Sequence, residues 1–336
     1  MEWRRGSKST PSIHGPPWQT LTRFQHWHGL SQRMSIFSDG TPVSQWPIAP
    51  MHYFDYEILP GESDTGTSFY HSHVGFQAVT ANGALIVEDV RSPPYHYDGE
   101  RIFQLTDYFN KTDSVIEQGL TSNPFVWSGE TNGLLINGVG VGIGKQNDSS
   151  CKLPVVDVLP GKIYRFRIIG ATALSHVSMA FESHENLTII AADARYTRRI
   201  TMTVQQFQNG SIYWAQNGTP KQQLGPNNKI LVCKSRRSVG DDNPEYRIFG
   251  GKNAGGLDIH PFHAHGGHFW DIGCGDGMYD VVANEEKLKG YRPVLRDTTM
   301  LYRYADVGEA GKDANWRGWR LRVNQPGVYV IHCHIL

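Results

Sequence analysis

His26-Trp27-His28-Gly29, near the start of the chain, returns far downstream as His263-Ala264-His265-Gly266. Each copy is followed by a second His-x-His pair, His71-Ser72-His73 or His332-Cys333-His334, five residues after a glycine. In a strand, residues i and i+2 lie on the same face, so each pair can direct two imidazoles at one point. The repeat predicts two similar domains, which could bind a metal cluster at their interface.

The number of these pairs argues against coincidence. The chain has 15 histidines among 336 residues, which gives fewer than one His-x-His pair by chance. Eight neutral imidazoles suit copper, zinc, iron or nickel, but closed zinc sites use far fewer of them. The alternative is that surface and core histidines happen to alternate.

The fourth pair differs from the others in its middle residue. If His332 and His334 face one way, Cys333 faces the other, where a thiolate could bind a second metal. His260 precedes His263 by three residues and could turn toward the same sulfur. Histidine, cysteine and a further histidine with a weak axial ligand form the ligand set of blue copper. For Cys333 alone, a buried structural cysteine is the alternative.

The rest of the chain is typical of short strands. Its 36 glycines and 18 prolines favour many turns over long helices, and no amphipathic helix longer than three turns is evident. In 164–168, apolar residues alternate with Arg165 and Arg167, as in a strand that is wet on one side. Trp319–Val323 and Val328–His334 flank Pro326-Gly327, which predicts a hairpin. Five more short strands are expected at 84–87, 102–105, 187–191, 200–204 and 230–233. An all-β chain of packed sandwiches follows.

Composition and short sequence signals bear on which partners the protein binds and where in the cell it acts. Thirty-two basic and thirty-two acidic residues balance, which removes any bulk argument for nucleic acid or anionic membranes as partners. No apolar run reaches the length of a membrane span, and the N-terminus lacks the apolar core of a signal peptide. Five Asn-x-Ser/Thr sequons nevertheless favour a secreted glycoprotein. They begin at Asn110, Asn147, Asn186, Asn209 and Asn217. The spacing of the four cysteines fixes no disulfide.

The histidine segments resemble the four copper-binding motifs of the multicopper oxidases. The matching segments are His26-Trp27-His28-Gly29-Leu30-Ser31-Gln32, Tyr70-His71-Ser72-His73, His260-Pro261-Phe262-His263-Ala264-His265-Gly266 and His332-Cys333-His334-Ile335-Leu336. The likeness is greatest to the fungal laccase and ascorbate-oxidase-like branch. It covers the chain from about Gln25 onward, and the four motifs together are highly specific.

The resemblance implies tandem cupredoxin-like Greek-key sandwiches in three domains, at 1–106, 107–199 and 200–336. Each domain is expected to be incomplete. Few residues precede the first motif, the middle looks short, and the chain stops two residues after His334. The second histidine and the axial residue of the type 1 copper site are therefore expected to be missing, as in a fragment.

The resemblance also implies roles for individual residues. His26 and His263 resemble the type 2 copper ligands, and Cys333 and His260 resemble type 1 ligands. The six remaining histidines resemble the ligands of the type 3 copper pair: His28, His71, His73, His265, His332 and His334. Asp39 matches an acidic residue that assists proton delivery, although a simple turn aspartate is as good a reading. Asp193 falls where some fungal laccases hold a carboxylate against the phenol, although loop aspartates are common.

The implied activity is that of a copper-dependent oxidoreductase. A phenolic reductant, such as a pigment or secondary-metabolite phenol, would give up electrons singly, and O₂ would be reduced to water. Copper supplies the redox chemistry and the protein supplies the ligand geometry. The alternatives are an oxidase of ascorbate or ferrous iron and a catalytically silent copper-binding remnant. The oligomeric state is not predicted.

Overall fold

The computed structural model divides the chain into two compact units, residues 1–120 with 127–190, and residues 121–126 with 191–335. It describes residues 24–196 except 34, 90–91, 146–147, 149, 178, 180 and 182–187; residues 260–301 except 277–278 and 291–292; and residues 313–321 and 326–335. For the strand residues 2–3, 12–14, 205–209, 211–216, 219–220, 245–252, 276 and 313–315 it describes the backbone alone. No helix among these residues is long and apolar enough to cross a membrane.

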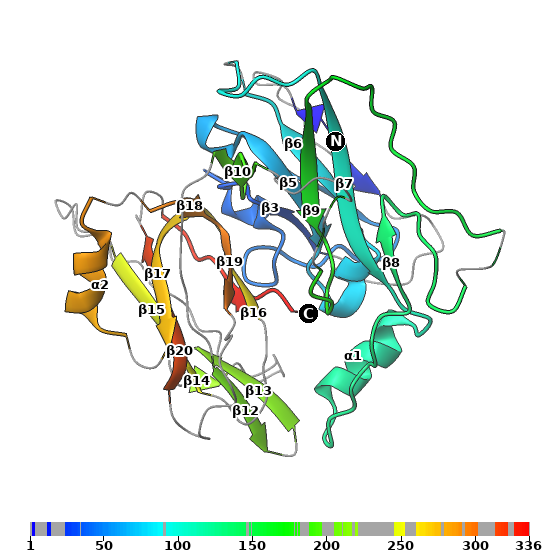
Figure 1. Ribbon diagram of the computed structural model, residues 1–336. Coiled ribbons are helices and arrows are strands. Elements are labelled where there is room, and N and C mark those ends of the chain that lie inside the picture. Colours follow the sequence, from blue (N-terminus) through cyan, green and yellow to red (C-terminus); the bar gives the residue numbers. More distant parts are fainter. Residues whose placement is uncertain are drawn as a thin grey trace. The chain divides into compact units, whose positions relative to one another are not determined.

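The first unit is built around a four-stranded sheet in the order β1-β6-β5-β3 (Figure 1). Its strands are β1 (Glu2–Trp3), β3 (Gln25–His28), β5 (Gly66–Ser72) and β6 (Asn82–Val87). Trp27 points from β3 into an apolar core that also holds Tyr56 and Leu85, and all three side chains are buried. Because neighbouring residues of a strand face opposite ways, the burial of Trp27 directs His26 and His28 to the other face.

A second sheet of this unit has the order β8-β7-β9, with β9 parallel to β7. The strands are β7 (Gly99–Tyr108), β8 (Gly133–Ile136) and β9 (Tyr164–Gly170); β2 (Ser12–His14) pairs separately with β4 (Tyr53–Asp55). The only α-helix described in the first unit, α1 (Asp113–Thr121), buries Ile116 against Phe76 and Val79. Three short 3-10 helices lie at Ile36–Asp39, Glu62–Asp64 and Gly75–Val79.

The strand predicted at 164–168 is confirmed as part of β9, but the prediction of its wet face is wrong. Arg165 and Arg167 are buried, whereas Ile168 is 48% exposed. The reason is ionic pairing: Arg167 donates from Nε and Nη2 to both carboxylate oxygens of Glu100, at 2.8 and 2.7 Å. A buried guanidinium with a bidentate carboxylate partner satisfies its donors without water.

The second unit contains two main sheets, in the orders β15-β20-β17-β18 and β19-β16-β21. Their strands are β15 (Glu245–Lys252), β16 (His260–Ala264), β17 (Phe269–Asp276), β18 (Leu295–Arg296), β19 (Thr298–Leu301), β20 (Asp313–Leu321) and β21 (Ile331–Cys333). The other elements are β10 (Ala191–Ala192), β11 (Arg195–Tyr196), β12 (Gln205–Asn209), β13 (Ser211–Gln216), β14 (Thr219–Pro220) and α2 (Val281–Leu288). Phe262, Phe269 and Trp319 form its core with Cys333.

Most of the expected strands that fall on described residues are confirmed, and the hairpin is wrong. Residues 84–87 and 102–105 lie in β6 and β7, whereas 188–190 belong to no strand and only Ala191 of that segment enters β10. β20 and β21 belong to different sheets, because β21 pairs with β16. The proposed turn residues 324–325 and the segments 200–204 and 230–233 lie outside the described residues, and the domain boundaries stay predictions.

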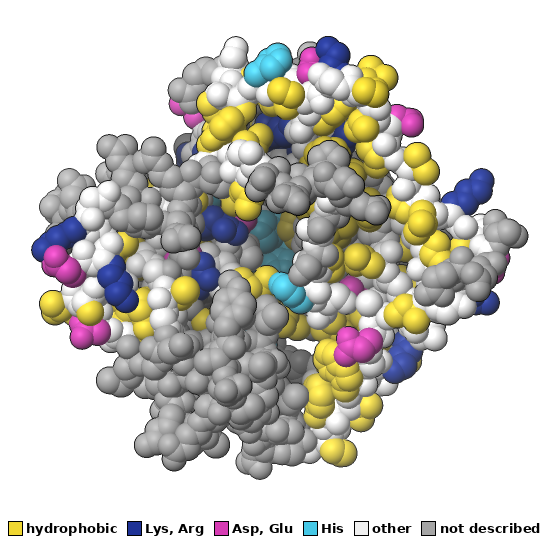
Figure 2. Space-filling model, viewed as in Figure 1, with side chains coloured by type: hydrophobic (Ala, Val, Ile, Leu, Met, Phe, Trp, Pro, Cys, Tyr) yellow, Lys and Arg dark blue, Asp and Glu magenta, His cyan; other side chains and the backbone are white. Residues whose placement is uncertain are grey.

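The described side chains on the face shown in Figure 2 mix both signs of charge with apolar groups. This matches the balance of 32 basic and 32 acidic residues in the chain.

Candidate metal centre

Four histidines of the first unit gather where β3 pairs with β5. His26 lies directly opposite His71 in the antiparallel ladder. Ligand nitrogens of His26, His28 and His71 all lie within 4.8 Å of one another. His73 follows the end of β5, held by a hydrogen bond from its amide to the carbonyl of Phe24 at 2.8 Å, and its ring centroid is 5.9 Å from that of His71. These four residues are called the first histidine set.

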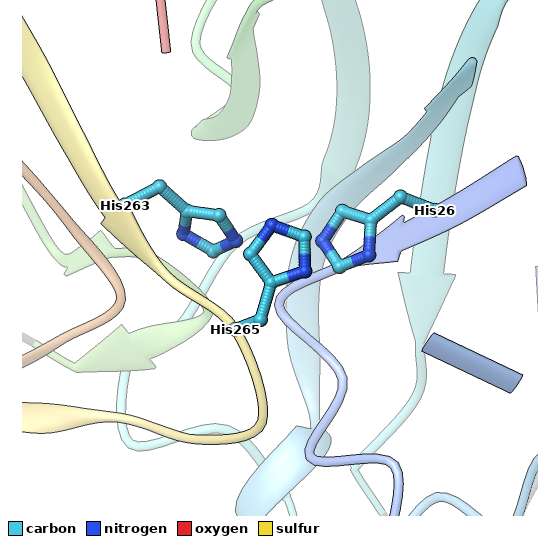
Figure 3. A group of neighbouring side chains, drawn as sticks. All are labelled: His26, His263 and His265. Atoms are coloured by element: carbon cyan, nitrogen blue, oxygen red, sulfur yellow. The ribbon is translucent and has the colours of Figure 1, made fainter. Parts of the chain in front are cut away.

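The second unit repeats this arrangement on β16 and β21. His263 lies directly opposite His332, and the amide of His334 donates to the carbonyl of Pro261 at 2.5 Å. His263 lies on β16 and His265 just beyond its end, with their rings turned toward one another and their centroids 4.7 Å apart (Figure 3). Nε2 of His265 lies 3.0 Å from Nε2 of His332. His263, His265, His332 and His334 are called the second histidine set.

The strands that carry the two histidine sets pair in the same register. This confirms that the second unit repeats the arrangement of the first, as the sequence repeat predicts. In both, the first histidine of the HxHG segment faces the first histidine of the later pair. In both, the glycine of HxHG has a positive φ, 86° at Gly29 and 79° at Gly266, a conformation that favours glycine. Each His-x-His pair places its two imidazoles close together, but both residues lie within one strand only for His26 and His28; in the other three pairs the second histidine lies just past the strand end.

The Nδ1 atom of one histidine on each of β3, β5, β16 and β21 is hydrogen-bonded to a backbone carbonyl. The distances are 2.6 Å for His26 to Asp39, 2.9 Å for His71 to Ser72, 2.9 Å for His263 to Asp297 and 2.9 Å for His332 to Cys333. A carbonyl accepts only, so Nδ1 carries the proton and Nε2 keeps its lone pair. Metal-ligating histidines are held in this way in proteins generally.

Burial keeps His71 in the neutral state that a metal ligand needs. His71 has no exposed surface, and burial lowers its pKa to about 3, with His28 adding to the effect. Asp39, also fully buried, lies with Oδ1 3.5 Å from Nδ1 of His26. Burial raises the pKa of the Asp39 carboxyl to about 8, although a hydrogen bond from Thr41 lowers it in part. Asp39 can therefore hold a proton near neutral pH.

Cys333 and His260 come together on the opposite side of the second set, as predicted. Sγ of Cys333 lies 3.5 Å from Nδ1 of His260, and both residues are buried. Burial lowers the pKa of His260 to about 3, which leaves a neutral imidazole beside the sulfur. Phe262, Phe269 and Trp319 pack around Cys333 and exclude water from it.

Asp193 lies in the loop between β10 and β11, and hydrogen bonds hold its side chain within the second unit. Its carboxylate accepts hydrogen bonds from Arg296 and from the backbone amides of Asp297 and Thr298. The expected contact with a phenol is not tested by these bonds and stays a prediction.

Two residues near the second set were not singled out as site residues from the sequence. Asp297 contacts His263 in the same way as Asp39 contacts His26. Its backbone carbonyl accepts a hydrogen bond from Nδ1 of His263, and one of its carboxylate oxygens lies 3.9 Å from the same nitrogen. His268 donates from Nε2 to the Asp193 carbonyl oxygen at 3.0 Å. The internal repeat offered no signal for Asp297, because Asp39 follows His26 by 13 residues whereas Asp297 follows His263 by 34.

The donor chemistry fits copper. Imidazole nitrogens with fixed tautomers suit copper among the borderline metals, and a thiolate beside a histidine in an apolar pocket suits a blue copper site. Mostly β units that carry such sets are typical of copper proteins with cupredoxin-like domains.

Family models described as multicopper oxidase match residues 22–92, 99–240 and 198–336. The chain is 34% identical to laccase-like multicopper oxidase 1 of Thermothelomyces thermophilus, over 93% of this chain and 76% of that protein. It is 24% identical to the L-ascorbate oxidase of Cucumis sativus, over 92% and 77% of the two chains. The chain belongs to the multicopper oxidase family.

Solved structures agree on the fold. The laccase from Botrytis aclada matches with a TM-score of 0.63 at 16% identity, covering 96% of this chain and 77% of that one. Fet3p, a multicopper oxidase that functions in iron import, matches with a TM-score of 0.58 at 16% identity, over 100% and 82%. These likenesses support the cupredoxin-like family domains but carry no information on substrate.

Proposed function

We propose that this chain is a copper-dependent oxidoreductase that couples one-electron oxidation of phenolic substrates to the reduction of O₂ to water. The observation that carries the proposal is the repeated histidine ladder, in which Nδ1 of His26, His71, His263 and His332 is bound to a carbonyl. That arrangement prepares Nε2 for a metal in each unit.

The residue roles follow the family resemblance. His26 and His263 would hold the type 2 copper, and the other six histidines of the two sets would hold the type 3 pair. Cys333 and His260 would hold the copper that accepts electrons. Bound copper supplies the one-electron redox chemistry.

The protein's own part is to hold protons and to exclude water. The buried Asp39 carboxyl, protonated up to about pH 8, would keep a proton close to Nδ1 of His26. Carbonyl partners keep the imidazole rings oriented when the charge near them changes. The apolar wall around Cys333 keeps water from the sulfur.

The relatives favour one class of reductant. The protein of Thermothelomyces thermophilus is described as laccase-like, and it is more similar to this chain than the L-ascorbate oxidase of Cucumis sativus, at 34% against 24% identity. This favours a phenol over ascorbate or ferrous iron. The second candidate is a protein that binds copper without turning over.

Copper reconstitution would test the proposal. Purified protein loaded with copper is expected to show a strong thiolate-to-copper absorption band and to consume O₂ with hydroquinone faster than with ascorbate or ferrous iron. Cys333→Ser should abolish the band and the O₂ consumption while leaving copper bound to the histidine sets. The matched control is Cys274→Ser, at an exposed cysteine of the same unit.

Three outcomes would decide against parts of the proposal. Bound copper without the band or O₂ uptake would favour the silent copper-binding protein. Preference for ascorbate or ferrous iron would overturn the phenol assignment. A failure of the wild-type protein to bind copper would overturn the proposal as a whole.

We also propose that the protein passes through the secretory pathway and carries N-linked glycan. Asn110, the sequon whose asparagine side chain the structure describes, is exposed and therefore accessible to modification. After expression in a eukaryotic secretory host, deglycosylation should lower the mass, and Asn110→Gln should remove part of that shift. An unchanged mass on deglycosylation would contradict this assignment.

A further inference from the structure

The Asp193 carboxylate is the centre of a hydrogen-bond cluster in the second unit. Oδ2 accepts from Arg296 Nε at 2.5 Å, from the Asp297 amide at 3.1 Å and from the Thr298 amide at 3.0 Å. Oδ1 accepts from Arg296 Nη2 at 3.2 Å. Hydrogen bonds between an ionised carboxylate and a guanidinium are about twice as strong as neutral ones. The carboxylate therefore ties one segment of the chain, Arg296 to Thr298, to the loop that carries Asp193.

The loop itself is built to present this carboxylate. Asp193 and Ala194 form the two-residue connection between β10 and β11, with φ values of 46° and 60°. Positive φ at both central residues is the geometry of a tight hairpin turn, and aspartate tolerates it better than alanine does. His268 secures the loop from the other side, with Nε2 3.0 Å from the Asp193 carbonyl oxygen.

The segment that Asp193 holds is the one that orients His263. The Asp297 carbonyl lies 2.9 Å from Nδ1 of His263 and also accepts from the Ala264 amide at 3.0 Å. Thr298 lies opposite His263 in the β16–β19 ladder, and its hydroxyl is 3.1 Å from the same Nδ1. The two amides bound by Asp193 thus belong to the two residues that lie within hydrogen-bond distance of Nδ1 of His263.

We propose that Asp193 is a positioning residue for His263, acting through the backbone of Asp297 and Thr298. This inference rests on the proposed function, because that proposal gives His263 a copper ligand role. By fixing the Asp297 carbonyl, the carboxylate fixes the proton on Nδ1 and the plane of the ring, so Nε2 keeps one direction. Three donors already occupy Oδ2, so a phenol contact of Asp193, which stays a prediction, would fall to Oδ1, which accepts from Arg296 alone among these donors.

The test compares three variants of the full chain. Asp193→Ala removes all four hydrogen bonds. Asp193→Asn keeps an oxygen for the backbone amides but sets an amide NH₂ against Arg296. Glu285→Gln is the matched control, because it weakens another carboxylate–arginine pair of this unit, Glu285 with Arg320 at 2.7 Å, away from His263.

Two measurements avoid reliance on turnover. In metal-free protein, hydrogen exchange at the Asp297 and Thr298 amides and the ¹⁵N shifts of the His263 ring should change in Asp193→Ala and stay unchanged in Glu285→Gln. In copper-loaded protein, the electron paramagnetic resonance signal of the type 2 copper should change, with copper affinity about 10- to 100-fold weaker. Asp193→Asn should lie between wild type and Asp193→Ala in both measurements.

The experiments distinguish a failure of the positioning role of Asp193 from a failure of the proposed copper function. If Asp193→Ala raises KM for hydroquinone while the exchange and the spectrum match wild type, Asp193 contacts substrate and the positioning role is overturned. If wild type binds no copper, the proposed function fails, yet the metal-free measurements still decide whether Asp193 orients His263. Should Asp193→Ala not fold, Asp193→Asn carries the same comparison, and a wild-type result for it in both measurements would overturn the inference.

Discussion

Replacing Arg317 by methionine should destabilise the second unit in a way that depends on pH. Arg317 donates from Nη2 to Oδ2 of Asp271 at 2.7 Å and from Nε to the same oxygen at 3.2 Å. Asp271 has no exposed surface, so water does not solvate its carboxylate charge. Removing one partner of a buried ion pair costs about 3–5 kcal/mol of unfolding free energy.

The pH dependence follows from the Asp271 carboxyl. Burial raises its pKa to about 7 from 3.8, although Arg317 lowers it in part. Between these values the folded protein holds a proton that the unfolded chain has released. The contribution to stability is therefore full below pH 3.8 and is lost as the pH rises toward 7. The loss is about 1.4 kcal/mol for each pH unit, and at most about 4 kcal/mol.

Arg317→Met raises the pKa of Asp271 further, so the decline should continue to higher pH. The variant should lose about 3–5 kcal/mol near pH 8 and much less near pH 4, where a protonated carboxyl needs no cation. Native-state hydrogen exchange of the β17 and β20 amides measures this free energy for the second unit alone. Arg320→Met, which removes the partner of the 42% exposed Glu285 side chain, is the control and should cost under about 1 kcal/mol at both pH values. An equal cost of Arg317→Met at the two pH values would refute the reasoning.

Three further changes test the packing and the site. Gly40→Ala should lower the free energy of unfolding by about 2–4 kcal/mol, measured by thermal unfolding, because the added Cβ would clash with the backbone carbonyl oxygen of Gln25 in β3. Gly138 has nearly the same positive φ but open space around it, so Gly138→Ala should lower the free energy of unfolding by only about 1 kcal/mol. Asp107→Ala should cost about 2–3 kcal/mol and speed hydrogen exchange at the three backbone amides that its carboxylate binds; unchanged exchange would contradict this. His71→Ala should weaken copper binding more than about 10-fold in equilibrium dialysis, and His52→Ala, at an exposed histidine outside both sets, should not.

The sequence predicted the elements of the site better than their surroundings. The His-x-His spacing depends only on the two-residue period of a strand, so the placement of His26 and His28, and of Cys333 behind His332, could be read from local pattern. The partners of these groups come from distant segments. Nothing in the pattern of Asp297 or Ser72 says that their carbonyls accept from histidine rings.

Pairing between residues far apart in the sequence also explains why two predictions about the fold were wrong. The polar residues Arg165 and Arg167 predicted a solvated face, but Glu100, on a strand parallel to theirs, neutralises Arg167 and allows burial. The hairpin after Trp319 was expected from its turn residues alone. Its second strand instead pairs with β16 in another sheet, and His332 consequently lies opposite His263.

The middle positions of the four His-x-His pairs hold Trp27, Ser72, Ala264 and Cys333, four side chains with little in common. Main-chain pairing sets the direction of the flanking imidazoles, so that direction does not depend on which side chain stands between them. A cysteine at one of these positions therefore places its sulfur on the far face of the strand without turning the imidazoles that flank it.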